Sequence, residues 1–249
     1  MKTAYDVYQY DEIRNLNIKL FTPDDGIVER YVIALHGFAG SMESCAISAL
    51  AEHLTQHSTA VLTFNYAGHG NDTQDSLFSV ECCKNDFRSM TQYAKNTYPA
   101  AQWTGVFATS FGGFLTLNLL NEIPDSVRIV LRAPAVNMPE VFARIVNSEG
   151  GGMSEYRQSG SVTLGYDHKL SVPYAFYQDL LENDVFRQDF DREMLLIHGD
   201  CDDVVLPIDT RAFCSRNPKI IRKEIAGADH RFLESLGQVM KISVPWLLK

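Results

Sequence analysis

The chain has 249 residues, of which 45% are hydrophobic and 21% are charged, and its formal net charge is −9 at pH 7. This length suits one large domain or two small ones, and the apolar content is ample for a sizeable core. The negative charge argues against binding to nucleic acid or to an anionic membrane, because both attract proteins through bulk positive charge.

The sequence shows no targeting signal, membrane span or cysteine motif. Its first residues are polar and acidic where a signal peptide needs an apolar run, and no apolar stretch approaches the roughly 18 residues of a membrane span. The five cysteines are odd in number and form no CxxC pair, which argues against a disulfide framework or a zinc site. We therefore expect reduced thiols in a cytoplasmic protein, with an unusual route of export left open.

Strand patterns recur along the chain. The tyrosine-rich opening segment, around residues 4–21, predicts one or two antiparallel edge strands. Beyond it, six short runs are apolar, rich in β-branched residues and nearly continuous rather than alternating in polarity, which is typical of parallel strands covered on both faces. These runs span residues 31–36, 59–65, 103–108, 127–133, 193–198 and 219–226.

Helical patterns alternate with these strands. Apolar residues recur at helical spacing over residues 42–56, 80–97, 111–122 and 232–248. Strand–helix alternation predicts an α/β fold, with a mostly parallel sheet and helices on both of its faces.

The alternation of strands and helices is interrupted between residues 135 and 191, where we expect a helix only near 174–184. A connection this long is usually functional. We interpret it as a small inserted cap, with 1–134 and 192–249 forming the core domain. Its aromatic residues offer a surface for an acyl group, although ordinary packing of a small subdomain explains them equally well. The candidate substrate-binding residues are Tyr156, Tyr166, Tyr174 and Tyr177.

Ser110 is the candidate nucleophile. It follows the predicted strand 103–108 and precedes a predicted helix, which is the strand–turn–helix setting of a nucleophile elbow. Such a turn needs small residues two positions before and after the serine. Gly112 satisfies this requirement, whereas Ala108 adds a methyl group in a tight place. The alternative is that Ser110 only caps a helix.

The segment His36-Gly37-Phe38 follows another buried strand, and its glycine lets a loop fold back over the edge of the sheet. In acyl-transfer enzymes, a backbone N–H from such a loop and the N–H after the nucleophile form the oxyanion hole. We therefore predict that the amides of Phe38 and Phe111 bind the oxyanion. We expect the side chain of His36 to be structural.

Two later loops supply an acid and a base. The acidic loop after the strand 193–198 favours Asp202 as the group that orients a histidine, with Asp203 as the alternative. A calcium loop or a solvated acidic turn are the competing interpretations, but the spacing is not that of an EF-hand. His230 lies in a turn between the last predicted strand and the last helix and is the candidate base. The other histidines, His198 included, have no comparable support.

The order Ser110, Asp202, His230 on successive strand-end loops strengthens all three assignments. The chain resembles the α/β-hydrolase superfamily from about Ile33 to its C-terminus, and within it the bacterial cinnamoyl/feruloyl-esterase-like branch, grouped with serine aminopeptidases and monoacylglycerol lipases. The resemblance rests on HGFAG (36–40), FNYAGHG (64–70), ATSFGG (108–113), LRAPAV (131–136), IHGDCDDVVLP (197–207) and GADHRF (227–232).

The resemblance implies an α/β-hydrolase fold, with Asp202 as the acid and His230 as the base. The residues and the resemblance together predict a serine hydrolase that cleaves carboxylic esters through an acyl-enzyme, with hydroxycinnamoyl or other short-to-medium acyl esters as candidate substrates. Two alternatives stay open, an amidase or aminopeptidase on the same triad and a catalytically silent fold that binds a small ligand. We expect a small-molecule ester as the partner, with no nucleic acid, no membrane, no cofactor and no metal.

Overall fold

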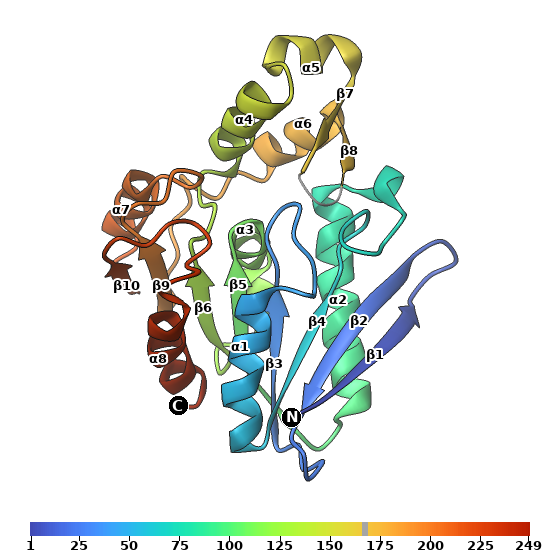
Figure 1. Cartoon of the computed structure of the whole chain (residues 1–249), viewed down its shortest axis with the longest axis vertical. Coiled ribbons are helices and arrows are strands. Elements are labelled where there is room, and N and C mark those ends of the chain that lie inside the picture. The colour runs from blue at the N-terminus through green and yellow to red at the C-terminus, as the bar shows by residue number, and fades with distance from the viewer. Residues whose placement is uncertain (166–168) are drawn as a thin grey trace.

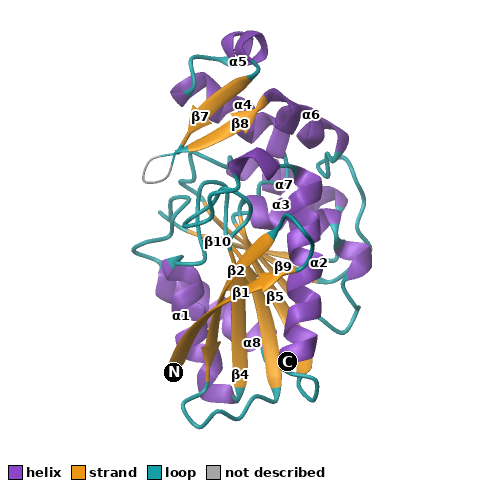
Figure 2. Ribbon diagram, turned by 90° about the vertical axis from the view of Figure 1, so that its right-hand side faces the viewer, coloured by secondary structure: helices purple, strands orange, loops and turns teal. Residues whose placement is uncertain are grey.

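A computed structural model describes residues 1–165 and 169–249, and an eight-stranded sheet runs through its centre (Figures 1 and 2). Neighbouring strands lie in the order β1-β2-β4-β3-β5-β6-β9-β10. The pairs β1–β2 and β2–β4 are antiparallel, and the other neighbouring pairs are parallel. The strands are β1 (Lys2–Gln9), β2 (Asn15–Thr22), β3 (Arg30–Leu35), β4 (Thr59–Phe64), β5 (Gln102–Thr109), β6 (Arg128–Arg132), β9 (Met194–Gly199) and β10 (Ile220–Ile225).

The central strands are buried on both faces, as their continuous apolar sequences predict. Every residue of β4 and of β9 is buried, whereas β1 at the edge of the sheet is exposed along almost its whole length. All six predicted parallel strands form, and the opening segment supplies the antiparallel pair β1 and β2. The predicted α/β fold with a mostly parallel sheet is confirmed.

Helices cover both faces of this sheet. Apolar residues of α1 and α8 form one core with one face, and those of α2 and α3 form a second core with the other. The helix α2 begins where Ser79 caps it, because the Ser79 hydroxyl accepts the Cys82 N–H at 3.0 Å. The helices outside the β6–β9 connection are α1 (Cys45–Leu54), α2 (Val80–Thr97), α3 (Phe111–Asn118), α7 (Pro207–Arg216) and α8 (Leu236–Leu247).

The chain leaves the main sheet after β6 and returns to it at β9, and we call the intervening segment the insertion. It lies over the end of the sheet where β3, β5 and β6 finish (Figure 1). Five phenylalanine rings pack the insertion onto the core, and we call them the aromatic cluster: Phe38, Phe78, Phe111, Phe142 and Phe176. The insertion contains α4 (Met138–Glu149), α5 (Met153–Ser159), β7 (Ser161–Leu164), β8 (Leu170–Pro173) and α6 (Tyr174–Glu182).

The structure corrects several sequence-based expectations. The predicted helix at 174–184 forms as α6, but the sequence analysis missed α4, α5, the antiparallel β7–β8 pair and α7. Of these, α5, β7 and β8 have only four to seven residues, so their periodicity is weak. The last helix begins at Leu236 rather than at residue 232, because Phe232 has a φ of 57° that is incompatible with a right-handed helix.

A buried ion-pair network ties the N-terminal hairpin to the rest of the core. Arg14, in the turn between β1 and β2, donates from Nε and Nη2 to the two carboxylate oxygens of Asp86 in α2, both at 2.9 Å. Its Nη1 donates to Asp72, in the loop after β4. All three side chains are at least 98% buried. The network therefore joins three segments that are far apart in the chain.

Candidate active site

Ser110 occupies the sharp turn between β5 and α3. Its φ of 52° and ψ of −114° fall in a region that non-glycine residues rarely adopt, so the turn holds this residue under strain. The turn is tied to the neighbouring strand, because the Ser110 N–H donates to the Arg132 carbonyl and the Ser110 carbonyl accepts the Ala135 N–H, both at 3.0 Å. This is the backbone geometry of a nucleophile elbow.

The two flanking small residues explain how the turn closes. A Cβ on Gly112 would lie 2.8 Å from the His36 carbonyl oxygen, which is closer than real Cβ atoms approach. Ala108 is completely buried within β5, and the strained turn forms with its methyl group in place. The departure from glycine at this position therefore leaves the elbow intact.

The loop after β3 packs directly on the serine. A Cβ on Gly37 would lie 3.1 Å from the Ser110 Cβ, so only a glycine lets the loop pass this closely without displacing its neighbour. His36 donates from Nδ1 to the Gly37 carbonyl at 2.8 Å. Burial lowers the pKa of His36 to about 3, so its ring is neutral and holds the loop rather than exchanging protons.

Phe38 and Phe111 are the two predicted oxyanion donors, and the centroids of their rings lie 6.5 Å apart. Phe111 is the first residue of α3, and the first N–H groups of a helix have no partner within it. Phe38 belongs to the loop that packs on Ser110, and both residues line a surface hollow that is described below. Their role as oxyanion donors stays a prediction.

The side chains of His230 and Asp202 are in direct contact. The His230 ring donates from Nδ1 to Asp202 Oδ2 at 2.8 Å, which leaves Nε2 as the nitrogen without the proton in the neutral ring. The Asp202 side chain is fully buried, and that of His230 is 18% exposed. Asp203 is exposed on the same loop. Of the two carboxylates that the sequence left open, Asp202 is therefore the one that the histidine contacts.

A second histidine binds the same carboxylate, and the sequence analysis did not single it out. The Nε2 atom of His198 lies 3.0 Å from Asp202 Oδ2 and 2.9 Å from the Val205 carbonyl. Both of these are acceptors, so Nε2 carries the proton. Asp202 Oδ1 accepts the N–H groups of Val204 and Val205. The available signal was the position of His198 at the end of a buried strand, four residues before Asp202.

These contacts determine the ionisation of Asp202. Burial by itself would raise its pKa, but the hydrogen bonds from His198 and His230, the charge of His230 and the Val205 N–H together hold the pKa well below its usual range. The carboxylate is therefore ionised at neutral pH and stabilises positive charge on His230.

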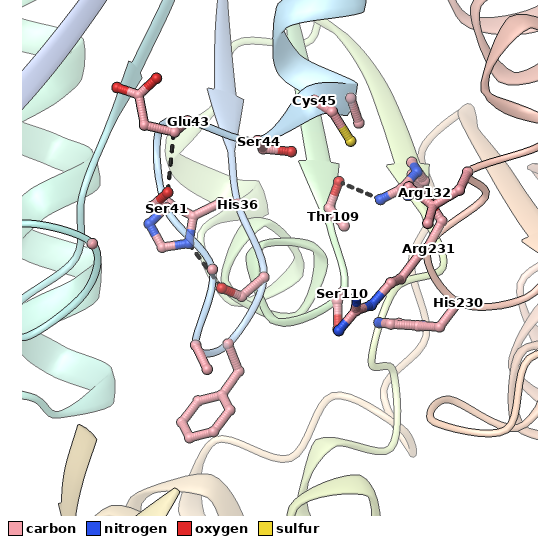
Figure 3. Close-up of a pocket in the computed structure, with 17 residues that line it drawn as sticks. His36, Ser41, Glu43, Ser44, Cys45, Thr109, Ser110, Arg132, His230 and Arg231 are labelled. Carbon is pink, nitrogen blue, oxygen red and sulfur yellow. Dashed lines mark hydrogen bonds between the residues drawn. The ribbon is translucent and has the colours of Figure 1, made fainter. Parts of the chain in front are cut away.

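A hollow of about 630 Å³ opens beside Ser110 (Figure 3). Its walls come from four places: the loop after β3 with the start of α1, Gly70 in the loop after β4, the ends of β5 and β6, and the turn that carries His230. Ser110 and His230 both line it, and Figure 3 labels them on its wall together with Arg231. Among its charged residues are Glu43, Arg132 and Arg231.

The three described tyrosines of the four expected to bind substrate do not line the hollow. Tyr156 is completely buried in the insertion and its hydroxyl donates to the Pro173 carbonyl at 2.6 Å, so it packs the insertion and faces no ligand in this arrangement. Tyr174 and Tyr177 are partly buried and do not line the hollow. Tyr166 falls outside the described residues. The hollow is instead polar on the side of α1 and His230.

Metal sites and membrane-spanning helices are both absent from the described ranges, 1–165 and 169–249. No three His, Cys, Asp or Glu side chains there lie close enough together to hold a metal ion. No helix there is long and apolar enough to cross a membrane.

Comparisons with known proteins identify relatives of this chain. The family described as "Serine aminopeptidase, S33" matches residues 26–190. No curated protein matches the chain by sequence.

Many solved structures share the fold. The structure of alpha/beta hydrolase domain-containing protein 10 from mouse has 19% identity and a TM-score of 0.75, with 98% of each chain covered. Est1E from Butyrivibrio proteoclasticus with ferulic acid bound has 21% identity and a TM-score of 0.77, with 94% of this chain and 96% of that chain covered. The esterase domain of a Rhodothermus marinus protein has 18% identity and a TM-score of 0.73, with 99% and 98% covered.

Proposed function

The chain belongs to the serine aminopeptidase S33 family of α/β-hydrolases, and from this premise we propose that it hydrolyses carboxylic esters through an acyl-enzyme on Ser110. The observation that carries the proposal is a strained Ser110 turn that lines the same hollow as His230, a histidine whose Nδ1 is bound to the buried Asp202. Nucleophile, base and orienting acid in one place are what acyl transfer needs.

The first half of the reaction forms the acyl-enzyme. Ser110 Oγ attacks the ester carbonyl carbon while His230 Nε2 takes the hydroxyl proton. When the C–O bond to the alcohol breaks, His230 returns this proton to the leaving alkoxide, and the alcohol departs. Asp202 keeps His230 in the tautomer with the proton on Nδ1 and stabilises the imidazolium that forms.

The second half releases the acid. A water molecule gives a proton to His230 and attacks the acyl carbonyl, and the ester bond to Ser110 then breaks as His230 returns the proton to Ser110 Oγ. In both halves the negative carbonyl oxygen is bound by the N–H groups of Phe38 and Phe111. Losing one such donor typically lowers kcat by about 10²- to 10³-fold.

The substrates we propose are esters with hydroxycinnamoyl or other short-to-medium acyl groups. The likeness to a structure with bound ferulic acid and the size of the hollow support an acyl group of this size. We also propose that the insertion, between β6 and β9, is a cap, which its place over the end of the sheet supports (Figure 1). Five free cysteines among the described residues fit a reducing, cytoplasmic location.

An amide bond is the second candidate, because the matching family is described as serine aminopeptidase. The same nucleophile and base cleave amides when the leaving amine is protonated by the histidine. Turnover of peptide arylamides exceeding that of esters would favour this alternative over ester hydrolysis.

The test is a panel of purified substrates: methyl ferulate, a butyrate ester, a decanoate ester and a peptide arylamide. We expect ester turnover that is lost in Ser110→Ala, with thermal unfolding confirming that the variant is folded. A clear preference for the decanoate ester would contradict the hydroxycinnamoyl assignment and leave the ester mechanism in place. Equal turnover by Ser110→Ala would contradict the mechanism itself.

A further inference from the structure

Arg132 is a buried cation at the wall of the hollow. It is the last residue of β6, it is 4% exposed, and it lines the hollow together with Ser110 and Thr109. Figure 3 shows it on the same side of the hollow as Arg231 and His230. Removing a charged group from water is expensive unless an opposite charge and hydrogen bonds compensate for it.

The compensation within the protein is incomplete. Arg132 donates from Nη1 to the Thr109 hydroxyl at 3.3 Å and from Nη2 to the Arg231 carbonyl at 2.5 Å, and its guanidinium stacks on the Phe232 ring at 4.8 Å. A guanidinium has five N–H groups. Among the described residues, the Nε–H is buried and has no hydrogen-bond partner.

No carboxylate of the described residues forms an ion pair with Arg132. The two carboxylates that influence it are already engaged: Asp202 with His198 and His230, and Asp229 with the Phe232 N–H. Burial lowers the pKa of Arg132 to about 10, and the nearby negative charges offset this only in part. Arg132 is therefore charged at neutral pH and lacks a direct counter-ion.

The rest of the hollow also favours an anion. The helix α1 begins on the wall of the hollow. The side chain of its N-cap residue, Ser44, accepts no hydrogen bond from the first N–H groups of the helix. Helix N-termini attract negative charge. The acidic side chain on this wall, Glu43, is paired with Lys19, so it does not cancel the charge of Arg132.

We propose that the hollow is a carboxylate-binding subsite, so that the substrate of this enzyme is an ester carrying a second, free carboxylate. Arg132 binds that carboxylate, with the start of α1 and Arg231 completing the positive surroundings. Because Ser110 lines the same hollow, the bound carboxylate and the ester carbonyl belong to one small molecule. This inference rests on the proposed ester hydrolysis and narrows its substrate class.

The test compares each anionic ester with a neutral analogue of the same shape. On the acyl side, the probes are the monomethyl esters of succinate, glutarate and adipate, each against the analogue whose carboxylate is replaced by a primary amide. On the alcohol side, butyryloxyacetate is compared with butyryloxyacetamide. The readout is the ratio of kcat/KM between the anionic and the neutral member of each pair.

We expect the wild type to prefer at least one anionic ester by about tenfold or more, because a charged hydrogen bond replaces a neutral one. Arg132→Gln should lower that ratio by about tenfold, and Arg132→Lys should restore part of it. The matched control is Arg128→Gln on the same strand, whose side chain pairs with Glu193 outside the hollow. We expect this variant to keep the wild-type ratio.

If Arg132 has a purely structural role, Arg132→Gln lowers kcat/KM for the anionic and the neutral ester equally, and their ratio stays unchanged. That result would overturn the proposal. A second measurement does not depend on turnover or on the folding of Arg132→Gln. In Ser110→Ala, glutarate should raise the Tm, since a ligand that binds the folded state stabilises it.

The two measurements separate this proposal from the one before it. Glutarate stabilisation of Ser110→Ala without any ester turnover by the wild type would retain the subsite and refute the esterase. The opposite result is also informative. If the wild type hydrolyses neutral esters, the kcat/KM ratio is near one in every pair and glutarate does not raise the Tm of Ser110→Ala, the esterase proposal is retained and the subsite is refuted.

Discussion

The Asp202 carboxylate accepts hydrogen bonds from two histidine rings and two backbone N–H groups. Replacing it by Asn keeps the size of the side chain and places an amide against His230 Nδ1, which disfavours the tautomer that can accept a proton from Ser110. We predict that Asp202→Asn lowers kcat by about 10⁴-fold, the size of the loss that this change causes in a Ser-His-Asp triad. Steady-state ester hydrolysis measures this loss.

The matched control is Asp203→Asn, which removes the neighbouring, exposed carboxylate. This variant should retain close to wild-type kcat. A large loss in Asp203→Asn with little loss in Asp202→Asn would reverse the assignment of the acid.

The same carboxylate links stability to pH. A carboxyl group whose pKa is lower in the folded protein than in the unfolded chain stabilises the fold above its unfolded pKa, about 3.9. Since the pKa of Asp202 is held low, this contribution is present at neutral pH and is lost as the pH falls below about 4. We predict that the Tm of the wild type falls more steeply with acid than that of Asp202→Asn. Parallel curves would contradict this linkage.

Single residues were predictable where a motif fixes them. Ser110, Asp202 and His230 follow from their places on strand-end loops, and the structure brings Asp202 and His230 into contact. His198 and Arg132 were not predictable in this way, because one residue at the end of a buried strand looks like any other. Arg132 contacts Thr109 on the neighbouring strand and the Arg231 carbonyl, which no local pattern records, whereas Asp202 and Val205, the partners of His198, lie four and seven residues after it.

At the scale of elements, the turn from β5 to α3 depends on close backbone approach. A Cβ on Gly112 would meet the His36 carbonyl and the Leu35 side chain at 2.8 Å. We predict that Gly112→Ala lowers the free energy of unfolding by about 1–3 kcal/mol, the usual range for overpacking, and lowers kcat because the serine shifts. Chemical denaturation and ester hydrolysis measure the two effects.

The control for this change is Gly237→Ala in α8, where an added Cβ meets nothing within 4 Å. Replacing glycine by alanine inside a helix stabilises it by about 0.4–1 kcal/mol. Equal destabilisation by both variants would show that the effect at Gly112 is not caused by crowding of the added Cβ.

The central strands and the long α2 were predictable from their patterns, whereas α4 and α7 were missed although they have twelve and ten residues. The strands β3, β4, β5, β6, β9 and β10 have continuous apolar sequences, and α2 has eighteen residues of clear periodicity. The short α5 of seven residues and the four-residue strands β7 and β8 give patterns that turns also produce.

At the scale of the whole molecule, the Arg14 network holds the N-terminal hairpin to the core. Arg14→Leu would leave Asp72 and Asp86 buried without their partner, and Asp86 in particular is completely buried. We predict a loss of about 3–5 kcal/mol in the free energy of unfolding, typical of breaking one side of a buried ion pair. Urea denaturation measures it.

A surface arginine provides the comparison. Arg88 pairs with Glu81 and Glu122, and its side chain is 40% exposed. Arg88→Leu should change the free energy of unfolding by no more than about 1 kcal/mol, because water screens exposed pairs. A similar loss in both variants would show that burial does not set the strength of the Arg14 network.

The central claim is that Ser110 is an activated nucleophile, and covalent labelling tests it most directly. The purified protein is treated with a fluorophosphonate probe, and the modified residue is located by mass spectrometry. Ser110→Ala is treated in parallel, together with Ser44→Ala, which removes another hydroxyl from the same hollow. We predict label on Ser110 in the wild type and in Ser44→Ala, and no label in Ser110→Ala. Folded wild type that stays unlabelled, or label that persists in Ser110→Ala, would contradict the account.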